Sequence, residues 1–141
     1  MLRLAAFAVT SALATAAAGP LPPLPLGRLL ASPDRLAISM TATGNPQLKR
    51  EYQLECDPVG GDHPQRERAC ARLDRLAREG KDPFAPVSRR QICSEQYGGP
   101  ATARITGTWR GRTVDATFRR TDGCEINRWD ELEPLLPSGR S

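Results

Sequence analysis

The sequence predicts a small α+β domain held together by disulfide bonds. Residues 36–56 and 101–118 each contain two stretches in which apolar and polar side chains alternate, a pattern typical of a β-hairpin. Between them, residues 62–80 carry apolar side chains at helical spacing. The chain of 141 residues also contains four cysteines, an even number that predicts a framework of two disulfide bonds.

The N-terminus predicts export. Arg3 supplies a positive charge, residues 4–18 are apolar or small, and this stretch ends in three alanines of the kind that signal peptidase recognises. We therefore expect residues 1–18 to be a signal peptide that is cleaved near the bond between Ala18 and Gly19. The alternative is a membrane anchor, but a helix that crosses a bilayer needs about 20 apolar residues.

Residues 19–35 are rich in proline and leucine, which predicts an extended, mobile arm. The alternative is that the leucines of this arm cover a sheet edge. The domain itself is expected to span residues 36–137, and residues 138–141 are expected to form a frayed tail. In an exported chain both disulfide bonds would persist, because the compartment is oxidising.

The first hairpin is predicted from alternation over residues 36–41 and again over residues 51–56, with a turn signal at residues 44–46. Its second strand ends at Cys56. Residues 57–61, which follow directly, are predicted to be a loop.

The predicted helix begins at Asp62, whose carboxylate is placed to cap the first turn, and Pro64 suits that turn. Gly80 is a natural C-terminal stop. Residues 82–85 are expected to form one more short helical turn. The apolar face of the helix consists of Ala69, Leu73, Leu76 and Ala77.

The second hairpin is the clearest in the chain, because residues 101–110 and 114–118 alternate on either side of Gly111. A turn at residues 121–123 then leads into Cys124. The pattern defines no element after Trp129. The apolar residues of this last part are Ile126, Trp129, Leu132, Leu135 and Leu136.

Four cysteines allow three pairings, and the sequence alone does not choose among them. A bridge from Cys56, at the end of a strand, to Cys70, in the adjacent helix, is favoured on geometry and leaves Cys93 to pair with Cys124. Each bridge would contribute about 3–4 kcal/mol on the chain-entropy model. The alternative is a free pair or a metal site, but the spacings contain no CxxC motif and His63 is the only histidine.

Composition and motifs disfavour several function classes. The net charge of +4 comes almost entirely from arginines interleaved with acidic residues, without the aromatic platform of a nucleic-acid-binding surface. Catalysis by Ser-His-Asp or Cys-His needs a histidine on which partners converge, whereas His63, beside Pro64, suits capping or packing. The sequence contains no phosphate-binding glycine loop. We therefore expect a binding or inhibitory module that uses no cofactor and no metal, rather than an enzyme.

Six short sequence motifs, in this order along the chain, form a more specific pattern: residues 54–58, 60–64, 69–73, 93–100, 106–109 and 122–126. Together, from Leu36 to Trp129, they resemble the Streptomyces-type subtilisin inhibitor-like family of secreted serine protease inhibitors. The resemblance implies a five-stranded antiparallel sheet with two helices and the bridges Cys56–Cys70 and Cys93–Cys124. It also implies a secreted homodimer that blocks subtilisin-type proteases with a substrate-like loop.

The resemblance further implies a reactive bond two residues after the loop cysteine, between Glu95 and Gln96. Such a segment is rigid and extended, so it loses little entropy when it docks into a protease. The positions along the loop would be Ile92 at P4, Cys93 at P3, Ser94 at P2, Glu95 at P1, Gln96 at P1′ and Tyr97 at P2′.

Glu95 departs from the family, whose members more often carry Met, Lys or another large residue at P1. A carboxylate that enters an apolar pocket loses hydration without gaining a partner. Two targets remain: a glutamate-preferring serine protease, or a subtilisin-type enzyme that tolerates Glu95 and binds Ile92 in its apolar S4 pocket. Arg89 and Arg90 would favour an acidic rim around the protease cleft.

Two alternatives to inhibition stay open on the same fold. One is a secreted binding or structural module that does not inhibit. The other is a substrate of an extracellular processing enzyme such as a transglutaminase, although the arm carries no glutamine or lysine before Gln47.

Overall fold

The computed structural model describes residues 19–20, 22–23 and 33–138. The predicted signal peptide, much of the predicted arm and residues 139–141 lie outside the described residues. The first strand begins at Asp34, two residues before the alternation that predicts it. Among the described helices, none is long and apolar enough to cross a membrane.

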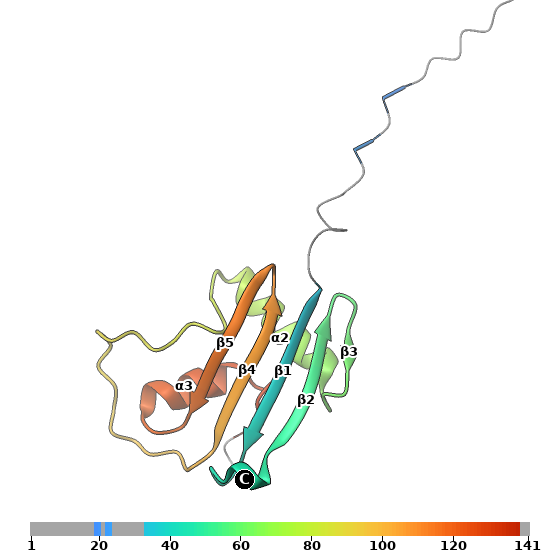
Figure 1. Cartoon of the computed structure of the whole chain (residues 1–141). Helices are drawn as coiled ribbons and strands as arrows, with labels where there is room; N and C mark the ends of the chain where they lie inside the picture. Colours follow the sequence, from blue (N-terminus) through green and yellow to red (C-terminus); the bar gives the residue numbers. More distant parts are fainter. Residues whose placement is uncertain (1–18, 21, 24–32, 139–141) are drawn as a thin grey trace, which may run out of the picture. The chain divides into compact units, whose positions relative to one another are not determined.

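The centre of the fold is a five-stranded antiparallel sheet with the strand order β3-β2-β1-β4-β5 (Figure 1). Both predicted hairpins are confirmed, and so is the five-stranded sheet that the family resemblance implies. The strands are β1 (Asp34–Thr41), β2 (Arg50–Cys56), β3 (Gly60–Gly61), β4 (Thr102–Trp109) and β5 (Arg112–Arg119). A short 3-10 helix, η1 (Pro46–Leu48), lies at the predicted turn between β1 and β2.

Strand β3 lies in the segment that the sequence predicts to be a loop. It contains only two glycines, of which Gly61 pairs with Leu54 of β2 and has a φ of +91°. A Cβ atom on Gly61 would collide with the backbone carbonyl of Gln53, so the close pairing requires glycine here.

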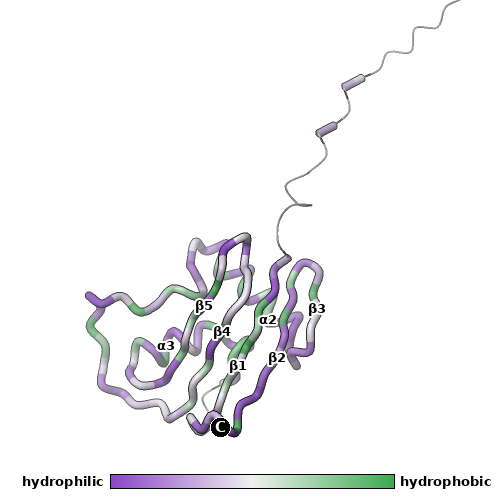
Figure 2. Tube along the Cα trace, viewed as in Figure 1, coloured by the Kyte–Doolittle hydropathy of each residue, from purple (hydrophilic) through white to green (hydrophobic). Residues whose placement is uncertain are grey.

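Strand register explains the alternating pattern of the sequence. Ile38 of β1 lies opposite Ile105 of β4, and Ile105 lies opposite Ala116 of β5, so apolar side chains gather on one face. Along the strands, the hydrophobic positions coloured green in Figure 2 are interrupted by hydrophilic ones. The buried apolar residues contributed by the strands are Leu36, Ile38, Leu54, Cys56, Ala103, Ile105, Trp109, Val114, Ala116 and Phe118.

Two α-helices, α2 (Arg66–Arg78) and α3 (Gly123–Glu131), lie on one side of the sheet (Figure 1). Helix α2 packs against β2, and α3 packs against β5. The predicted stop of α2 is confirmed: Gly80 has a φ of +74° and its N–H bonds to the carbonyl of Ala77 at 3.1 Å. Residues 83–84 form a turn rather than a helical segment.

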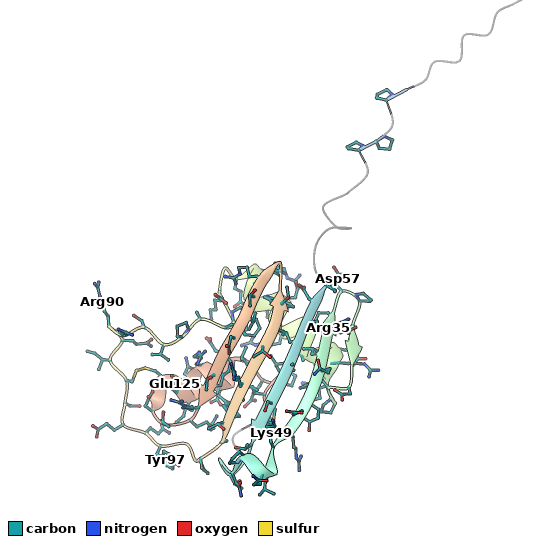
Figure 3. All side chains as sticks on the ribbon, viewed as in Figure 1. Arg35, Lys49, Asp57, Arg90, Tyr97 and Glu125 are labelled. Atoms are coloured by element: carbon teal, nitrogen blue, oxygen red, sulfur yellow. A yellow bond between two sulfur atoms is a disulfide. The ribbon has the colours of Figure 1, made fainter. Side chains whose placement is uncertain are left out.

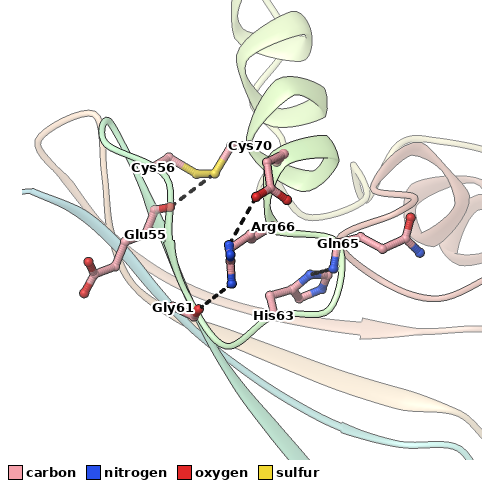
Figure 4. A network of polar contacts seen from close by, with 8 residues as sticks. Glu55, Cys56, Gly61, His63, Gln65, Arg66 and Cys70 are labelled. Carbon is pink, nitrogen blue, oxygen red and sulfur yellow. Dashed lines mark hydrogen bonds and ion pairs between the residues drawn. A yellow bond between two sulfur atoms is a disulfide. The ribbon is translucent and has the colours of Figure 1, made fainter.

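The predicted capping role of Asp62 is wrong. Helix α2 begins four residues later, and the Asp62 carboxylate accepts a hydrogen bond from the N–H of Gln53 at 2.6 Å. The backbone N–H of Gln65 is bonded instead by Nδ1 of His63 at 3.1 Å (Figure 4). His63 is buried, and its Nε2 lies 2.9 Å from the carbonyl oxygen of Leu135. Because Nδ1 accepts a bond, Nε2 carries the proton and donates, which is a packing role.

Both disulfide pairings are confirmed. Cys56 and Cys70 join the end of β2 to α2 (Figure 4), with Cα atoms 5.7 Å apart. Cys93 and Cys124 join the segment before β4 to α3, with Cα atoms 5.3 Å apart.

The end of the chain completes the core, although its sequence pattern predicts no element there. Helix α3 ends at Glu131, and the turns after it bury Leu132, Leu135 and Leu136. Trp129 is also buried, and its indole N–H bonds to the carbonyl of Pro137 at 2.9 Å.

Candidate functional site

The segment between α2 and β4 contains the two most exposed large hydrophobic side chains of the described chain. Residues 92–98, called the exposed loop below, form no helix or strand. Ile92 is 97% exposed and Tyr97 is 66% exposed, although both are large and apolar. Figure 3 shows Arg90 and Tyr97 beyond the β5 edge of the sheet, on the opposite side from Asp57. Both side chains are therefore available to contact another molecule.

The first end of the exposed loop is fixed to the beginning of α3. Cys93 is bonded to Cys124, and the next carbonyl, of Ser94, accepts a hydrogen bond from the N–H of Gly123 at 3.0 Å. This N–H is available because the first N–H groups of a helix have no partner within the helix. Asp122 caps α3 by accepting from the N–H of Glu125 at 3.0 Å. A Cβ atom on Gly123 would collide with the Ser94 side chain, so glycine permits this close contact.

The second end is fixed to the residue that follows β5. The N–H of Gly98 bonds to the carbonyl of Arg120 at 2.7 Å, and Nε of Arg120 bonds to the carbonyl of Gly98 at 3.2 Å. Arg120 is itself held by Asp130, whose Oδ1 lies 2.8 Å from Nη1 of the arginine. A Cβ atom on Gly98 would lie 2.8 Å from the side chain of Ile126, which again requires glycine.

The residues between these two ends are Glu95, Gln96 and Tyr97, and all three are exposed. Within the described part of the chain they take part in no hydrogen bond, ion pair or ring contact. Their backbone N–H and C=O groups are therefore open to pairing with another chain, as in strand addition. Both ends of the segment are held while its middle remains accessible.

Arg89 and Arg90 approach the exposed loop from its Cys93 side. Both are exposed, and neither side chain has an acidic partner among the described residues. They place two positive charges beside Ile92, as the sequence predicts.

The same region does not offer a metal site. Cys93, Asp122 and Cys124 place potential ligand atoms within 4.8 Å of one another. The two sulfur atoms are joined in a disulfide, so they provide no thiolate, and the Asp122 carboxylate caps α3.

Sequence reasoning missed Arg120 as a part of this region. A signal was present: Val114, Ala116 and Phe118 point inward along β5, and Arg120 follows in the same inward series. A charged residue at an inward position requires a buried partner. The sequence does not predict that Arg120 bonds to the backbone of Gly98, because Gly98 lies in another segment of the chain.

The fold and the exposed loop define a small, disulfide-bonded α+β protein that presents a fixed, accessible segment of itself. Residues 31–121 match the family model described as subtilisin inhibitor-like, and the chain belongs to this family, whose members are protease inhibitors and not enzymes.

Individual relatives were also found. The chain is 34% identical to "Subtilisin inhibitor-like protein 1" of Streptomyces cacaoi over 105 residues, which cover 70% of this chain and 92% of that protein. It is 29% identical to "Subtilisin inhibitor" of Streptomyces violaceus over 129 residues, 86% of this chain and 85% of that protein. Among solved structures, Streptomyces caespitosus sermetstatin in complex with Bacillus licheniformis subtilisin matches with a TM-score of 0.48 and 19% identity, covering 76% of this chain and 100% of that one.

Proposed function

We propose that this protein is a secreted serine protease inhibitor that binds as a substrate and is cleaved slowly at the bond between Glu95 and Gln96. Ile92, Cys93 and Ser94 would contact the protease on the acyl side of this bond. Tyr97 would contact it on the amine side.

One observation carries the proposal: the exposed loop is held at Ser94 and at Gly98, whereas the residues between them are exposed and unbonded within the described chain. A segment that is already fixed at both ends loses little entropy on binding. A flexible surface loop of the same sequence would be an ordinary substrate.

The chemistry follows from these two anchors. The protease serine would add its Oγ to the Glu95 carbonyl carbon, and the Gln96 nitrogen would leave with a proton as an amine. The acyl side stays in place through Cys93, and the amine side stays near through Gly98. The amine then attacks the acyl-enzyme and restores the peptide bond, so re-ligation competes with hydrolysis and the complex persists.

Glu95 determines the target. Its side chain is exposed in the free protein and would enter the S1 pocket of the protease. A carboxylate in an apolar pocket loses hydration without compensation, whereas a basic pocket supplies a partner. We therefore propose either a glutamate-preferring protease or a subtilisin-type enzyme that tolerates Glu95 and gains from Ile92 in its S4 pocket.

Arg89 and Arg90 would select a protease with an acidic rim. Opposite charges speed association, and salt screens them. We expect the Arg89→Ala/Arg90→Ala double variant to associate more slowly and with a weaker dependence on salt. The Arg50→Ala/Arg75→Ala variant removes the same charge from exposed positions on β2 and α2 and is the matched control. Equal salt dependence in both variants would exclude a local role for the pair.

Secretion and a homodimer, which the family implies, extend the proposal. Two disulfide bonds suit an oxidising extracellular compartment. A chain that begins near Gly19 in the culture medium would support secretion. Sedimentation of the purified protein at micromolar concentration would decide between monomer and dimer.

The central experiment titrates the purified mature chain against a subtilisin and against a glutamyl endopeptidase. Mass spectrometry then maps any bond that is slowly cleaved. Stoichiometric inhibition with cleavage only between Glu95 and Gln96 is the expected result. Inhibition of neither enzyme would favour a non-inhibitory module, and rapid degradation would favour a processing substrate.

A further inference from the structure

Arg120 is a buried arginine whose contacts all lead to the exposed loop or to its support. Only 7% of its side chain is exposed. Nε donates to the carbonyl of Gly98, Nη1 donates to Asp130, and the guanidinium lies over the ring of Trp129 with its carbon 5.7 Å from the ring centroid. Its own carbonyl accepts from the N–H of Gly98.

A charge at this place is costly unless it is fully paired. Ala116 and Phe118 precede Arg120 in the inward series of β5, and a further apolar residue would continue the core. Asp130 and the carbonyl of Gly98 instead supply partners for the guanidinium. Arg120 therefore joins α3, the end of β5 and the exposed loop in one network.

The two sides of the proposed reactive bond are held by different means. The acyl side is held by a covalent bond, between Cys93 and Cys124. The amine side is held by the pair of hydrogen bonds between Gly98 and Arg120, and the next fixed pairing along the chain is Thr102 with Thr41 of β1. The Arg120 side chain makes one of these two bonds and its backbone carbonyl makes the other, so a change in this side chain weakens the amine-side anchor without breaking a covalent bond.

We propose that Arg120 is a positioning residue that keeps the newly formed amino group of Gln96 beside the acyl-enzyme. This inference rests on the proposed function. With Gly98 held, two residues separate Gln96 from a fixed point, a reach of about 7 Å at about 3.5 Å per residue. If both bonds to Gly98 open, the fixed point becomes Thr102 and the reach grows to about 21 Å.

The wider reach lowers the local concentration of the amine. A threefold longer tether dilutes its end about 5-fold if the chain is flexible, because the effective concentration falls as about the −3/2 power of length. Re-ligation slows in proportion, whereas hydrolysis by water does not. The inhibitor would then be consumed faster, although its initial docking would change little.

Lysine cannot replace Arg120 in this role. The planar guanidinium presents several N–H groups in a fixed fork, so it can bond to Gly98 and Asp130 together. A lysine keeps the charge and can still reach an acidic partner, but it has a single nitrogen at the end of a flexible stem. Arg120→Lys therefore tests the fork while it preserves the charge.

Arg128→Lys is the matched control. Arg128 lies on α3, its side chain is 11% exposed, and it pairs with Glu125. It also donates to the carbonyls of Ala85 and Thr117, and its guanidinium lies over the ring of Phe118. None of these partners belongs to the exposed loop, so this variant loses a comparable network without releasing Gly98.

The experiment incubates each protein with the protease that the wild type inhibits and follows cleavage between Glu95 and Gln96. We expect Arg120→Lys to be cleaved faster, by up to about 5-fold, the value for complete loss of the Gly98 anchor, with a shift of the equilibrium between intact and cleaved inhibitor toward the cleaved form. The association rate should stay within about twofold of wild type. Arg128→Lys should be cleaved at the wild-type rate, whatever its change in thermal stability.

A second readout keeps the inference separate from the proposed function. The N–H of Gly98 bonds to the backbone carbonyl of Arg120, which Arg120→Lys keeps, but loss of the guanidinium bond to the Gly98 carbonyl should loosen this pairing. Amide exchange at Gly98 should therefore be faster in Arg120→Lys, whereas exchange at Gly123 should not change. If the wild type inhibits neither protease, the proposed function fails. If the wild type does inhibit, and Arg120→Lys shows faster exchange at Gly98 but unchanged cleavage, only the role of Arg120 in re-ligation is overturned. Equal effects of Arg120→Lys and Arg128→Lys on cleavage would overturn it as well.

Discussion

The two disulfide bonds are the same chemical link in two different surroundings. Cys56 and Cys70 are buried in the core and join β2 to α2. Cys93 and Cys124 are only partly buried and join the exposed loop to α3. The first bridge is surrounded by packed side chains, whereas the second is backed by the hydrogen bond from Gly123 to Ser94. The first therefore stabilises the fold, and the second stabilises the conformation of one segment.

The largest expected effect comes from removing the second bridge. In the Cys93→Ser/Cys124→Ser variant, the acyl side of the proposed reactive bond loses its covalent link and keeps only the hydrogen bond from Gly123 to Ser94. We expect cleavage between Glu95 and Gln96 to accelerate on the order of 10³-fold, because re-ligation loses the effective concentration that the tether provides. Chromatography with mass spectrometry measures this rate. A variant that resists the protease as well as wild type would show that the bridge has no part in inhibition.

Removing the first bridge should affect stability instead. The chain-entropy model assigns about 3 kcal/mol to a loop of this length, and the two cysteines are separated by 14 residues. We expect Cys56→Ala/Cys70→Ala to lower the free energy of unfolding by about this amount, measured in urea, and to inhibit like wild type while it remains folded. The chain-entropy model assigns a similar stabilisation to the second bridge, so the two double variants should differ in their rate of cleavage and not in their stability. Faster cleavage of folded Cys56→Ala/Cys70→Ala would remove the distinction.

A change of charge at Glu95 should alter selectivity without altering the fold. Glu95 has no partner among the described residues, so Glu95→Lys breaks no contact there. We expect inhibition of a trypsin-like protease to improve by about 100-fold, because a lysine at P1 fits an acidic S1 pocket. Glu79→Lys makes the same change at an exposed position after α2 and should have no such effect. Unchanged selectivity in Glu95→Lys would mean that another residue occupies P1.

Most of the sheet and helix α2 could be predicted from the sequence, because alternation and helical spacing indicate which side chains face a common core. Strand β3 could not, since two glycines have no alternation. Asp62 was assigned to the wrong partner because the N–H of Gln53 lies nine positions earlier in the sequence and competes for its carboxylate. The burial of Leu135 and Leu136 depends on packing that no periodic pattern records.

The structure of the exposed loop could be predicted less well from the sequence. Its proposed reactive bond rests on family resemblance, and the residues that fix its ends belong to segments distant in the sequence. Gly98 is held by Arg120, and Ser94 is held by Gly123, which opens a helix that the sequence pattern did not define. Local patterns predict elements, whereas the support of a loop arises only when those elements are packed together.

The smallest expected effect concerns an ion pair on the solvent side of the sheet, away from the exposed loop. Arg104 of β4 donates two hydrogen bonds of 2.9 Å to Asp115 of β5, and these bonds lower the pKa of the Asp115 carboxyl below its usual value.

Because the pKa of Asp115 is lower in the folded state, its pair with Arg104 stabilises the protein above the ordinary pKa of about 4 and loses this effect as the pH falls below it. Both side chains are exposed, so the gain is small and salt screens it. We expect the difference in Tm between wild type and Asp115→Asn to be slight at pH 7 and to become smaller as the pH falls below about 4, or in high salt. Cleavage by the protease should be identical in the two proteins, and a change in it would show that the sheet surface and the exposed loop are not independent.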